Sequence, residues 1–423
     1  MSPSTSRIPR FYRLSLAERR QILRTRADLS DGDLAALESG GLNARGADQI
    51  VENAVGVYAL PLGLGLNFLI NGEDVLIPMA VEEPSVIAAA SNAARMVREG
   101  GGFQADADEP IMTAQIELLG VGDEAAARAR IEAATEELLA QAGAALPRLL
   151  ERGGGPRAIE VRTGSHPARV IVHVHIDCRN AMGANMVNTI AEALAERLAD
   201  LSGGRSGLRI LTNLCDRRLV RVQARVPASA LAVATPEASF SGAEVRDGVV
   251  AASRFAEDDV YRAATHNKGI MNGVDAVVIA TGNDWRGVEA GAHAFAAQSG
   301  RYRPLAVWRA DDDGWLVGKL EMPMPVGIVG GTVKVHAGAR LAHRILGWAG
   351  TSATRLAMAI GSAGLASNLA ALRALATDGI QRGHMALHRK AVRLPAGRDP
   401  IEPAPSRDGK GGDHPLVAEG RGE

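Results

Sequence analysis

The alternation of strand and helix patterns between residues 111 and 226 is the feature that most constrains what this chain can fold into. Strands are indicated by short β-branched runs, and helices by longer segments rich in Ala, Glu and Leu. In chain order the predicted elements are the strand Ile111–Val121, the helix Asp123–Gly143, the strands Ala158–Arg162 and Val170–Asp177, the helix at about Asn185–Leu201, and the strands Leu208–Leu211 and Leu219–Val226.

This order is close to strand–helix–strand–strand–helix–strand, which is the ferredoxin-like pattern. The apolar, glycine-rich style of the first hundred residues resumes after it, so the segment looks inserted into a larger domain. We therefore predict an α+β fold with a discontinuous large domain of mixed helices and strands, 1–110 and 220–377. The inserted domain is predicted at 111–219.

Composition excludes several classes of protein. A chain of 423 residues is long enough for two or three domains. The net charge of −1 gives no reason to expect a nucleic acid or a membrane surface as partner. Two cysteines argue for a reducing compartment, and the N-terminus has no apolar signal region. We expect a cytoplasmic protein whose Pro- and Gly-rich tail, 393–423, is disordered.

The stretch Tyr261–His293 gathers many polar residues around the apolar run Val277–Ala280. The run is short and β-branched, so we predict a buried strand there. Lys268 before the strand and Asp284 after it could then meet at one end of a sheet. A structural ion pair and a catalytic pair both fit this spacing.

Glu83 follows a predicted β-hairpin, in which Asn71-Gly72 suits a type I′ turn between Phe68–Ile70 and Val75–Met79. Pro84 suits the first position of the helix that comes next. Glu83 is therefore either a helix N-cap or, if its pKa is raised by burial, a proton donor.

His384 lies in Gly379–Met385, shortly before the tail that we expect to be disordered. It is either a histidine on a helix surface or a general acid, which would suit a thiolate leaving group at neutral pH.

The loop Asn180–Asn185 joins a strand to a helix, and its small residues allow a phosphate to approach the backbone. A Gly-x-Gly-x-x-Gly fingerprint is absent, so any dinucleotide must bind in a non-Rossmann manner. His173, His175 and Asp177 alternate along one strand, but no further ligand cluster accompanies them. We expect solvent-facing residues there and no metal.

Seven stretches together resemble hydroxymethylglutaryl-coenzyme A (HMG-CoA) reductase of the soluble bacterial class II. They span roughly residues 50–390 and several are long and specific. They are Glu52-Asn53-Ala54-Val55-Gly56, Val81–Ser85, Ala181–Asn185, Tyr261–Asn272, Ala280–Ala292, Glu321–Val326 and Ala374–Leu387.

The resemblance implies a reaction that interconverts HMG-CoA with mevalonate and coenzyme A by two hydride transfers, and that could also run oxidatively in mevalonate catabolism. It implies that Lys268 stabilises the oxyanion, Glu83 supplies a proton, Asp284 tunes both, and His384 protonates the departing CoA thiolate. It also implies a homodimer, or a higher assembly, whose active sites are shared between subunits.

The same resemblance implies residues that bind substrate and cofactor. The inserted domain would bind NAD(P)(H), and a flap at 378–392 would carry His384. The residues that would hold the hydroxymethylglutaryl end are Ser85, Arg262 and Asn272, and those near the cofactor are Met182, Gly183, Ala184, Asn185 and Asn213.

Three features depart from the family pattern. Asn180 stands where the family has Asp, and Leu146 stands where NAD-using relatives carry the acid that binds the adenosine ribose. Without that carboxylate, and with Arg148 nearby, a 2′-phosphate meets no repulsion. NAD(H) is favoured because close class II relatives use it, and NADP(H) is the alternative. Lastly, the family continues after the His384 segment with a folded helical flap. The tail of this chain has few apolar residues to bury, so it looks unable to fold in that way.

Overall fold

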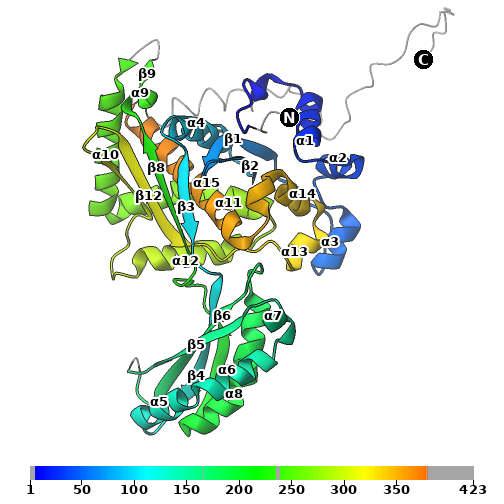
Figure 1. Cartoon of the computed structure of the whole chain (residues 1–423), viewed down its shortest axis with the longest axis vertical. Coiled ribbons are helices and arrows are strands. Elements are labelled where there is room, and N and C mark those ends of the chain that lie inside the picture. The colour runs from blue at the N-terminus through cyan, green and yellow to red at the C-terminus, as the bar shows by residue number, and fades with distance from the viewer. Residues whose placement is uncertain (1–4, 165, 235–238, 378, 380–423) are drawn as a thin grey trace, which may run out of the picture.

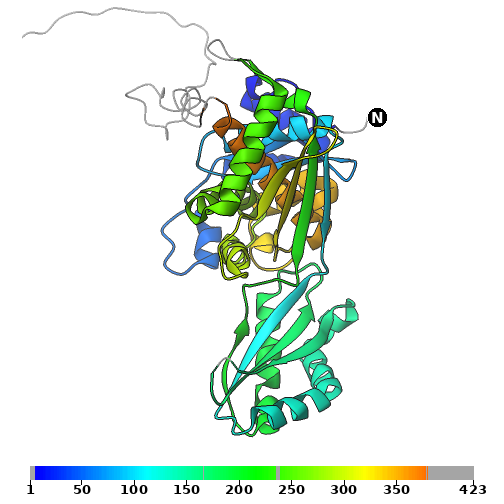
Figure 2. The same cartoon turned by 90° about the vertical axis from the view of Figure 1, so that its left-hand side faces the viewer.

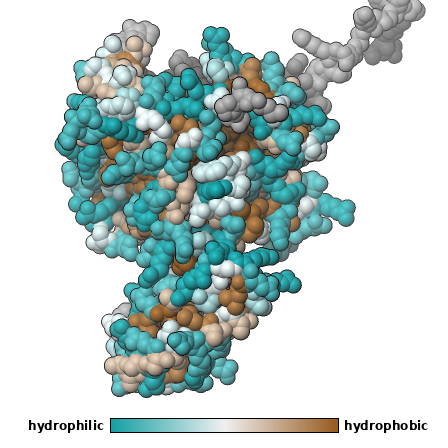
Figure 3. Space-filling model, in the orientation of Figure 1, coloured by the Kyte–Doolittle hydropathy of each residue, from teal (hydrophilic) through white to brown (hydrophobic). Residues whose placement is uncertain are grey.

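The computed structural model describes residues 5–164, 166–234, 239–377 and 379. They form two lobes joined by a narrow connection (Figures 1 and 2). Each lobe has its own sheet and its own apolar core. The outer face seen in Figure 3 is mostly polar, with small apolar patches on both lobes. The predicted flap segment and tail lie outside the described residues.

The large lobe is built on a six-stranded sheet with the order β11-β12-β8-β3-β1-β2. Its neighbours are antiparallel except β1 and β3, which meet in parallel at a single residue pair. The strands are β1 (Leu62–Ile70), β2 (Glu73–Ala80), β3 (Phe103–Ala107), β8 (Leu219–Val226), β11 (Ala306–Ala310) and β12 (Leu316–Pro323).

The longest helices that pack against this sheet and share its core are α4 (Val86–Glu99), α10 (Gly242–Asp258), α11 (Val260–Ala280) and α15 (Ala353–Leu375). Among the described helices, α15 alone is long and apolar enough to span a membrane, but 78% of that window is buried in this fold. Burial of this kind is what a central core helix requires.

Shorter elements complete the large lobe and its edge. They are η1 (Phe11–Arg13), α1 (Leu16–Arg26), α2 (Asp31–Glu38), α3 (Ala44–Ile50), α9 (Ala228–Leu231), β9 (Val233–Ala234), β10 (Ser239–Phe240), α12 (Trp285–Ala297), α13 (Gly331–Val335), α14 (Ala337–Leu346) and η2 (Gly347–Gly350).

The small lobe has a four-stranded sheet with the order β5-β6-β4-β7, in which all three pairings are antiparallel. Helices pack on it through a separate core of apolar residues. Its elements are β4 (Ile111–Leu119), α5 (Glu124–Ala133), α6 (Thr135–Ala144), α7 (Pro147–Glu151), β5 (Gly155–Arg162), β6 (Arg169–Asp177), α8 (Ala184–Ser202) and β7 (Arg205–Leu211).

The prediction of a strand at Val277–Ala280 is wrong. These residues form the last turn of α11, a helix of 21 residues. The signal was present further upstream, because Ala263, Ile270, Val274 and Val277 are buried at spacings of three, four and seven residues. That period belongs to a helix, and a window of four residues was too short to reveal it.

Other predicted boundaries also change. β8 pairs with β3 and β12, so of the last two predicted strands only β7 belongs to the small sheet. The predicted helix Asp123–Gly143 is divided at Ala134. His175 and Asp177 were expected to face solvent, but they are 4% and 0% exposed.

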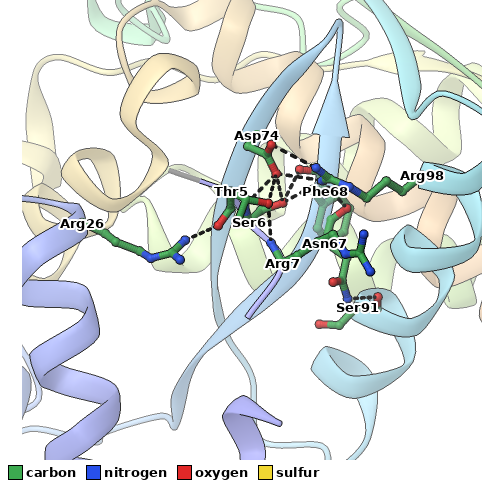
Figure 4. A network of polar contacts seen from close by, with 9 residues as sticks. All are labelled: Thr5, Ser6, Arg7, Arg26, Asn67, Phe68, Asp74, Ser91 and Arg98. Atoms are coloured by element: carbon green, nitrogen blue, oxygen red, sulfur yellow. Dashed lines mark hydrogen bonds and ion pairs between the residues drawn. The ribbon is translucent and has the colours of Figure 1, made fainter. Parts of the chain in front are cut away.

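A buried polar network fixes the start of the chain to the hairpin β1–β2 (Figure 4). The backbone N–H and the hydroxyl of Ser6 each donate to Asp74 at 2.6 Å. Arg98, on α4, donates to both carboxylate oxygens of Asp74, at 2.7 and 3.0 Å. Arg26 donates to the carbonyl of Thr5 and so ties α1 to the same point. One carboxylate therefore holds three segments that are distant in sequence.

Burial alone would raise the pKa of Asp74, but hydrogen bonds from Arg98 and Ser6 outweigh it and lower the pKa to about 2. We predict that Asp74→Asn lowers the free energy of unfolding by about 1.5–3 kcal/mol at pH 7, measured by urea denaturation. Because the folded pKa lies below the unfolded value of 3.8, the difference should shrink as pH falls from 4 towards 2.

The exposed pair of Glu99 with Arg95 supplies the control. Glu99→Gln should change stability by less than about 0.5 kcal/mol. An effect of Asp74→Asn as small as this would contradict the central role of Asp74.

Candidate active site

A cavity of about 490 Å³ lies between α4, α11 and α15. Five of the residues predicted from sequence line it, namely Glu83, Ser85, Arg262, Lys268 and Asn272. The rest of the wall is largely apolar and includes Ala89 of α4 and Ala371 and Leu375 of α15. The cavity can therefore enclose a ligand that is apolar along its length and charged at one end.

Helix α11 supplies one side of this cavity because its polar residues recur at helical spacing. Arg262, Gly269 and Asn272 lie within three turns of one another and line the same wall. The helix is capped by Asp259, whose carboxylate accepts from the N–H of Arg262 at 2.7 Å. The cap places Arg262 in the first turn, at the edge of the cavity.

Lys268 and Glu83 form an ion pair, with 3.3 Å between the Lys268 Nζ and the Glu83 Oε2. The lysine side chain is 64% exposed in the single chain. An ammonium group here can stabilise a developing oxyanion, and a carboxyl group beside it can exchange a proton with the same centre.

The N-cap of α4 is Ser85, so the alternative that Glu83 caps this helix is wrong. Ser85 has a φ of 78°, in the left-handed region that non-glycine residues rarely adopt. Such a conformation costs about 1–3 kcal/mol and is found chiefly at functional sites. The turn at Ser85 thus leaves Glu83 free to face Lys268.

Arg262 is half-buried, and burial lowers the pKa of its guanidinium. Among the described residues, no acidic side chain pairs with it. A guanidinium without a carboxylate partner at the edge of a cavity is suited to bind a carboxylate or phosphate of a ligand.

Five polar residues of the cavity were not predicted from sequence: Asn92, Thr265, His266, Ser367 and Asn368. Burial, followed by the charge of Arg262, lowers the pKa of His266 to about 4, so this side chain is neutral at pH 7. Its Nε2 contacts the carbonyl of Ala306 at 3.0 Å. His266 lies at helical spacing from Arg262 and Asn272, and this spacing could have placed it in the site. It was overlooked because a strand was predicted in this stretch.

The loop that precedes α8 has the features of an anion site. Gly183 has a φ of 111°, and a Cβ there would lie 2.4 Å from the Cys178 Sγ, so only glycine fits. Among the described residues, no side chain forms a capping hydrogen bond at the N-terminus of α8. The first-turn amides, at Ala184 and Asn185, can therefore donate to a phosphate.

Arg218 holds this loop against the large lobe. Its guanidinium is 4% exposed and donates to the carbonyls of Met182 at 2.9 Å, Ala181 at 3.3 Å and Val326 at 2.5 Å. Asn180, the departure noted above, accepts from the Ala353 N–H at the start of α15 at 3.0 Å. The loop is thus anchored to both the glycine-rich segment and the central helix.

Asp284 lies at a different place from Lys268. It caps α12, where its carboxylate accepts from the Gly287 N–H at 3.2 Å, and it faces Arg286 at 3.5 Å. Asn213 lies beside it, because a Cβ on Gly287 would be 3.0 Å from Asp284 and 3.4 Å from Asn213.

The prediction that Lys268 and Asp284 meet within one chain is therefore wrong. Lys268 and the end of α11 are separated by 12 residues of helix. At 1.5 Å per residue this is about 18 Å along the axis. Among the described residues, no contact joins the two side chains.

Comparisons with known proteins agree with this architecture. The family model described as hydroxymethylglutaryl-coenzyme A reductase matches residues 15–389. A 3-hydroxy-3-methylglutaryl-coenzyme A reductase from Archaeoglobus fulgidus is 45% identical over 413 residues, which are 96% of this chain and 92% of that one. A probable reductase of the same name from Borreliella burgdorferi is 32% identical over 388 residues, 89% and 84% of the two chains.

A class II 3-hydroxy-3-methylglutaryl-CoA reductase from Streptococcus pneumoniae, solved bound to NADPH in open conformations, superposes with a TM-score of 0.82. It is 42% identical, and the match covers 87% of this chain and 99% of that one. This chain belongs to the hydroxymethylglutaryl-coenzyme A reductase family. Its resemblance to the class II form, inferred from sequence motifs, is confirmed.

His384, predicted from sequence as a general acid, is outside the described residues. Within them, no group of three or more His, Cys, Asp or Glu side chains could hold a metal ion. His175 instead contacts Thr113 at 2.9 Å and Glu160 at 3.4 Å.

Leu146, at the position where the resemblance led us to expect an acidic residue in an NAD-using enzyme, is the N-cap of α7 and packs against the small-lobe core. Arg148, on the same short helix, is exposed. No carboxylate at position 146 therefore opposes a 2′-phosphate there.

The buried contacts of Arg218 generate a prediction for this reductase. Arg218→Met should weaken binding of the reduced nicotinamide cofactor about tenfold, because about 1.4 kcal/mol is lost once the loop is no longer held. Titration of the cofactor's fluorescence, carried out with NADH and with NADPH, measures the effect, and a circular dichroism spectrum verifies folding. Arg217→Met, which removes an exposed partner of Glu160, is the control. Equal cofactor affinity in both variants would contradict the role of Arg218.

Proposed function

We propose that this protein is an HMG-CoA reductase that interconverts HMG-CoA with mevalonate and coenzyme A, using two hydrides from or to NAD(P)(H). The observation that carries the proposal is the cavity, which combines the Lys268–Glu83 pair with an unpaired Arg262 guanidinium. A thioester carbonyl needs an oxyanion partner, and a dicarboxylic acid derivative needs a cation for its free carboxylate.

We assign the free carboxylate of the substrate to Arg262, with Ser85 and Asn272 beside it on the same cavity wall. The thioester carbon then lies towards Lys268, whose ammonium stabilises the oxyanion of the hemithioacetal and afterwards polarises the aldehyde. Glu83 gives its proton to the aldehyde oxygen in the second reduction. The apolar wall of Ala and Leu residues excludes water from these steps.

We assign cofactor binding to the small lobe, as a ferredoxin-like domain. Its strand order and its β-α-β-β-α-β connectivity support this assignment. When bound there, the nicotinamide supplies or accepts the hydride at the substrate carbon. Met182, Gly183, Ala184 and Asn185 would receive the phosphates at the start of α8, and Asn213 would lie nearby.

Both NAD(H) and NADP(H) fit this lobe in our proposal. The exposed Arg148 and the apolar Leu146 support acceptance of a 2′-phosphate. The Streptococcus relative was solved with NADPH, which also supports it. NAD(H), which was favoured from sequence, has no 2′-phosphate and so does not need the charge of Arg148.

We further propose a homodimer with shared active sites. Asp284 and Asn213 are remote from Lys268 in one chain, and the exposed side of α11 at Lys268 is open to a second subunit. The extended segment before β1 exposes Val55 at 105% and Tyr58 at 92%, which a partner would cover. In this arrangement the partner supplies Asp284 and the cofactor lobe to the Lys268 site.

His384 completes the proposed mechanism as the acid that protonates the CoA thiolate on its departure. In the oxidative direction, which would serve mevalonate catabolism, it deprotonates the incoming CoA thiol.

The direct test is an assay of mevalonate- and CoA-dependent reduction of NAD and of NADP by the purified protein. We expect turnover with at least one cofactor, and a loss of at least about 100-fold in Lys268→Ala, because the oxyanion partner is removed. Lys334→Ala, at an exposed position of α13, is the control. A protein that binds CoA but turns over neither cofactor is a binding paralogue, and the proposal then fails.

Mixing two inactive variants tests the shared site. If Lys268 and Asp284 act across subunits, Lys268→Ala and Asp284→Ala chains together rebuild one intact site per mixed dimer. Random mixing of equal amounts should then restore about a quarter of the wild-type activity. The measurement is kcat after co-refolding or co-expression. If kcat of the mixture does not exceed that of either variant alone, both residues act in the site of one subunit, and the proposal of a shared site fails.

A further inference from the structure

Asp275 is a polar residue of α11 that the proposed mechanism does not use. It follows Lys268 by seven residues and Asn272 by three, so all three lie on one side of the helix. The axial distance from Lys268 is about 10 Å. Asp275 therefore continues the row of catalytic side chains towards α12 (Figure 1).

The Asp275 carboxyl faces that of Glu289 on α12 within hydrogen-bonding reach. Its Oδ1 is buried and accepts no hydrogen bond from any donor among the described residues. Two ionised carboxylates have no hydrogen to share, so the pair is satisfied only when it holds one proton. Burial, and then the interaction with Glu289, raises the pKa of Asp275 to about 8.

The pair belongs to a ring of contacts that returns to α11. The Glu289 carboxylate lies 2.7 Å from the His293 Nε2, and the His293 Nδ1 lies 2.7 Å from the Tyr302 hydroxyl. Tyr302 in turn hydrogen-bonds to Asn267, the residue before Lys268. Asn267 is itself fixed, because its amide donates to the carbonyl of Arg303 at 2.9 Å.

Glu289, on α12, is the titratable group shown to face Asp275. His293 lies behind Glu289, and Tyr302, in the segment after α12, lies behind His293. From α14, His343 is directed to the carbonyl of Thr281 at the end of α11, and burial lowers its pKa. Glu289 is the charged group that acts on the pKa of Asp275.

We propose that Asp275 is a positioning residue, which shares a proton with Glu289 and thereby fixes the Lys268–Asn272 segment of α11 against α12. The ring holds this segment at both ends, at Asn267 and at Asp275. It also fixes α12, whose first turn carries Asp284 for the site of the neighbouring subunit. Loss of the shared proton places two like charges between the helices and loosens both halves of the site.

The proposal rests on the proposed reductase function for its kinetic test, so a test of stability accompanies it. The folded pKa of about 8 exceeds the unfolded value of 3.8, so the folded protein holds one more proton between these pH values. Its stability contribution is full below pH 4 and is lost as pH rises towards 8. Asp275→Asn keeps a donor towards Glu289 and does not titrate, so it should flatten the fall of Tm between pH 5 and 8.

The kinetic test compares wild type, Asp275→Asn and Asp275→Ala from pH 6 to 10. We expect wild-type kcat to fall above about pH 8, and the fall in Asp275→Asn to begin at least about one pH unit higher. Asp275→Ala should lose about tenfold in kcat with little change in the KM for HMG-CoA, and Asp275→Asn should recover most of that loss.

Asp200→Asn, at an exposed helix position of the small lobe, is the matched control and should leave both the pH profile and the Tm slope unchanged. An unchanged Tm slope in Asp275→Asn overturns the shared proton, whether or not the protein is a reductase. If Asp275→Asn changes the slope of Tm against pH but kcat still falls above the same pH as in the wild type, the positioning role is overturned. Absence of turnover in the wild type would instead refute the proposed function.

Discussion

The close approach of α11 and α15 is the constraint on which the rest of the structure depends. A Cβ on Gly273 would lie 2.4 Å from the Ala363 carbonyl oxygen, and one on Gly364 would lie 2.8 Å from Val274. Gly361 brings α15 equally near to β8, where a Cβ would meet Val222 at 2.9 Å. Glycine at these positions lets two long helices and a sheet pack without a gap, and this packing sets the walls of the cavity.

A second constraint links the lobes. Arg218 is buried and has no carboxylate partner in the part of the chain that the structure describes; the carbonyls of Ala181, Met182 and Val326 accept hydrogen bonds from its guanidinium instead. Because a buried cation is costly unless its hydrogens are bonded, this arrangement opposes movement of the loop away from the large lobe. The predicted anion site at α8 is therefore held to the same framework that carries Lys268.

Much of the fold could be predicted from sequence because its signals are local. The hairpin at Asn71-Gly72 appears where its turn residues indicate it. The helix that follows begins at Val86, two residues after Pro84, where its first position was predicted. The error at Val277–Ala280 arose because a short run of three β-branched residues and an alanine suits a buried strand and a buried helix equally well. Once α11 is a helix, its length separates Lys268 from Asp284, and this separation supports the proposal that two subunits share each active site.

The sequence by itself determined the family, the types of side chain at the site and most elements, because motifs and periodicity are properties of neighbouring residues. Only the tertiary structure decided which of those side chains meet. It joined Glu83 to Lys268 across 185 residues of sequence, left Arg262 without an acidic partner, and set Asp275 against Glu289. Such meetings depend on helix packing and burial, which involve residues far apart in the chain and have no local signal.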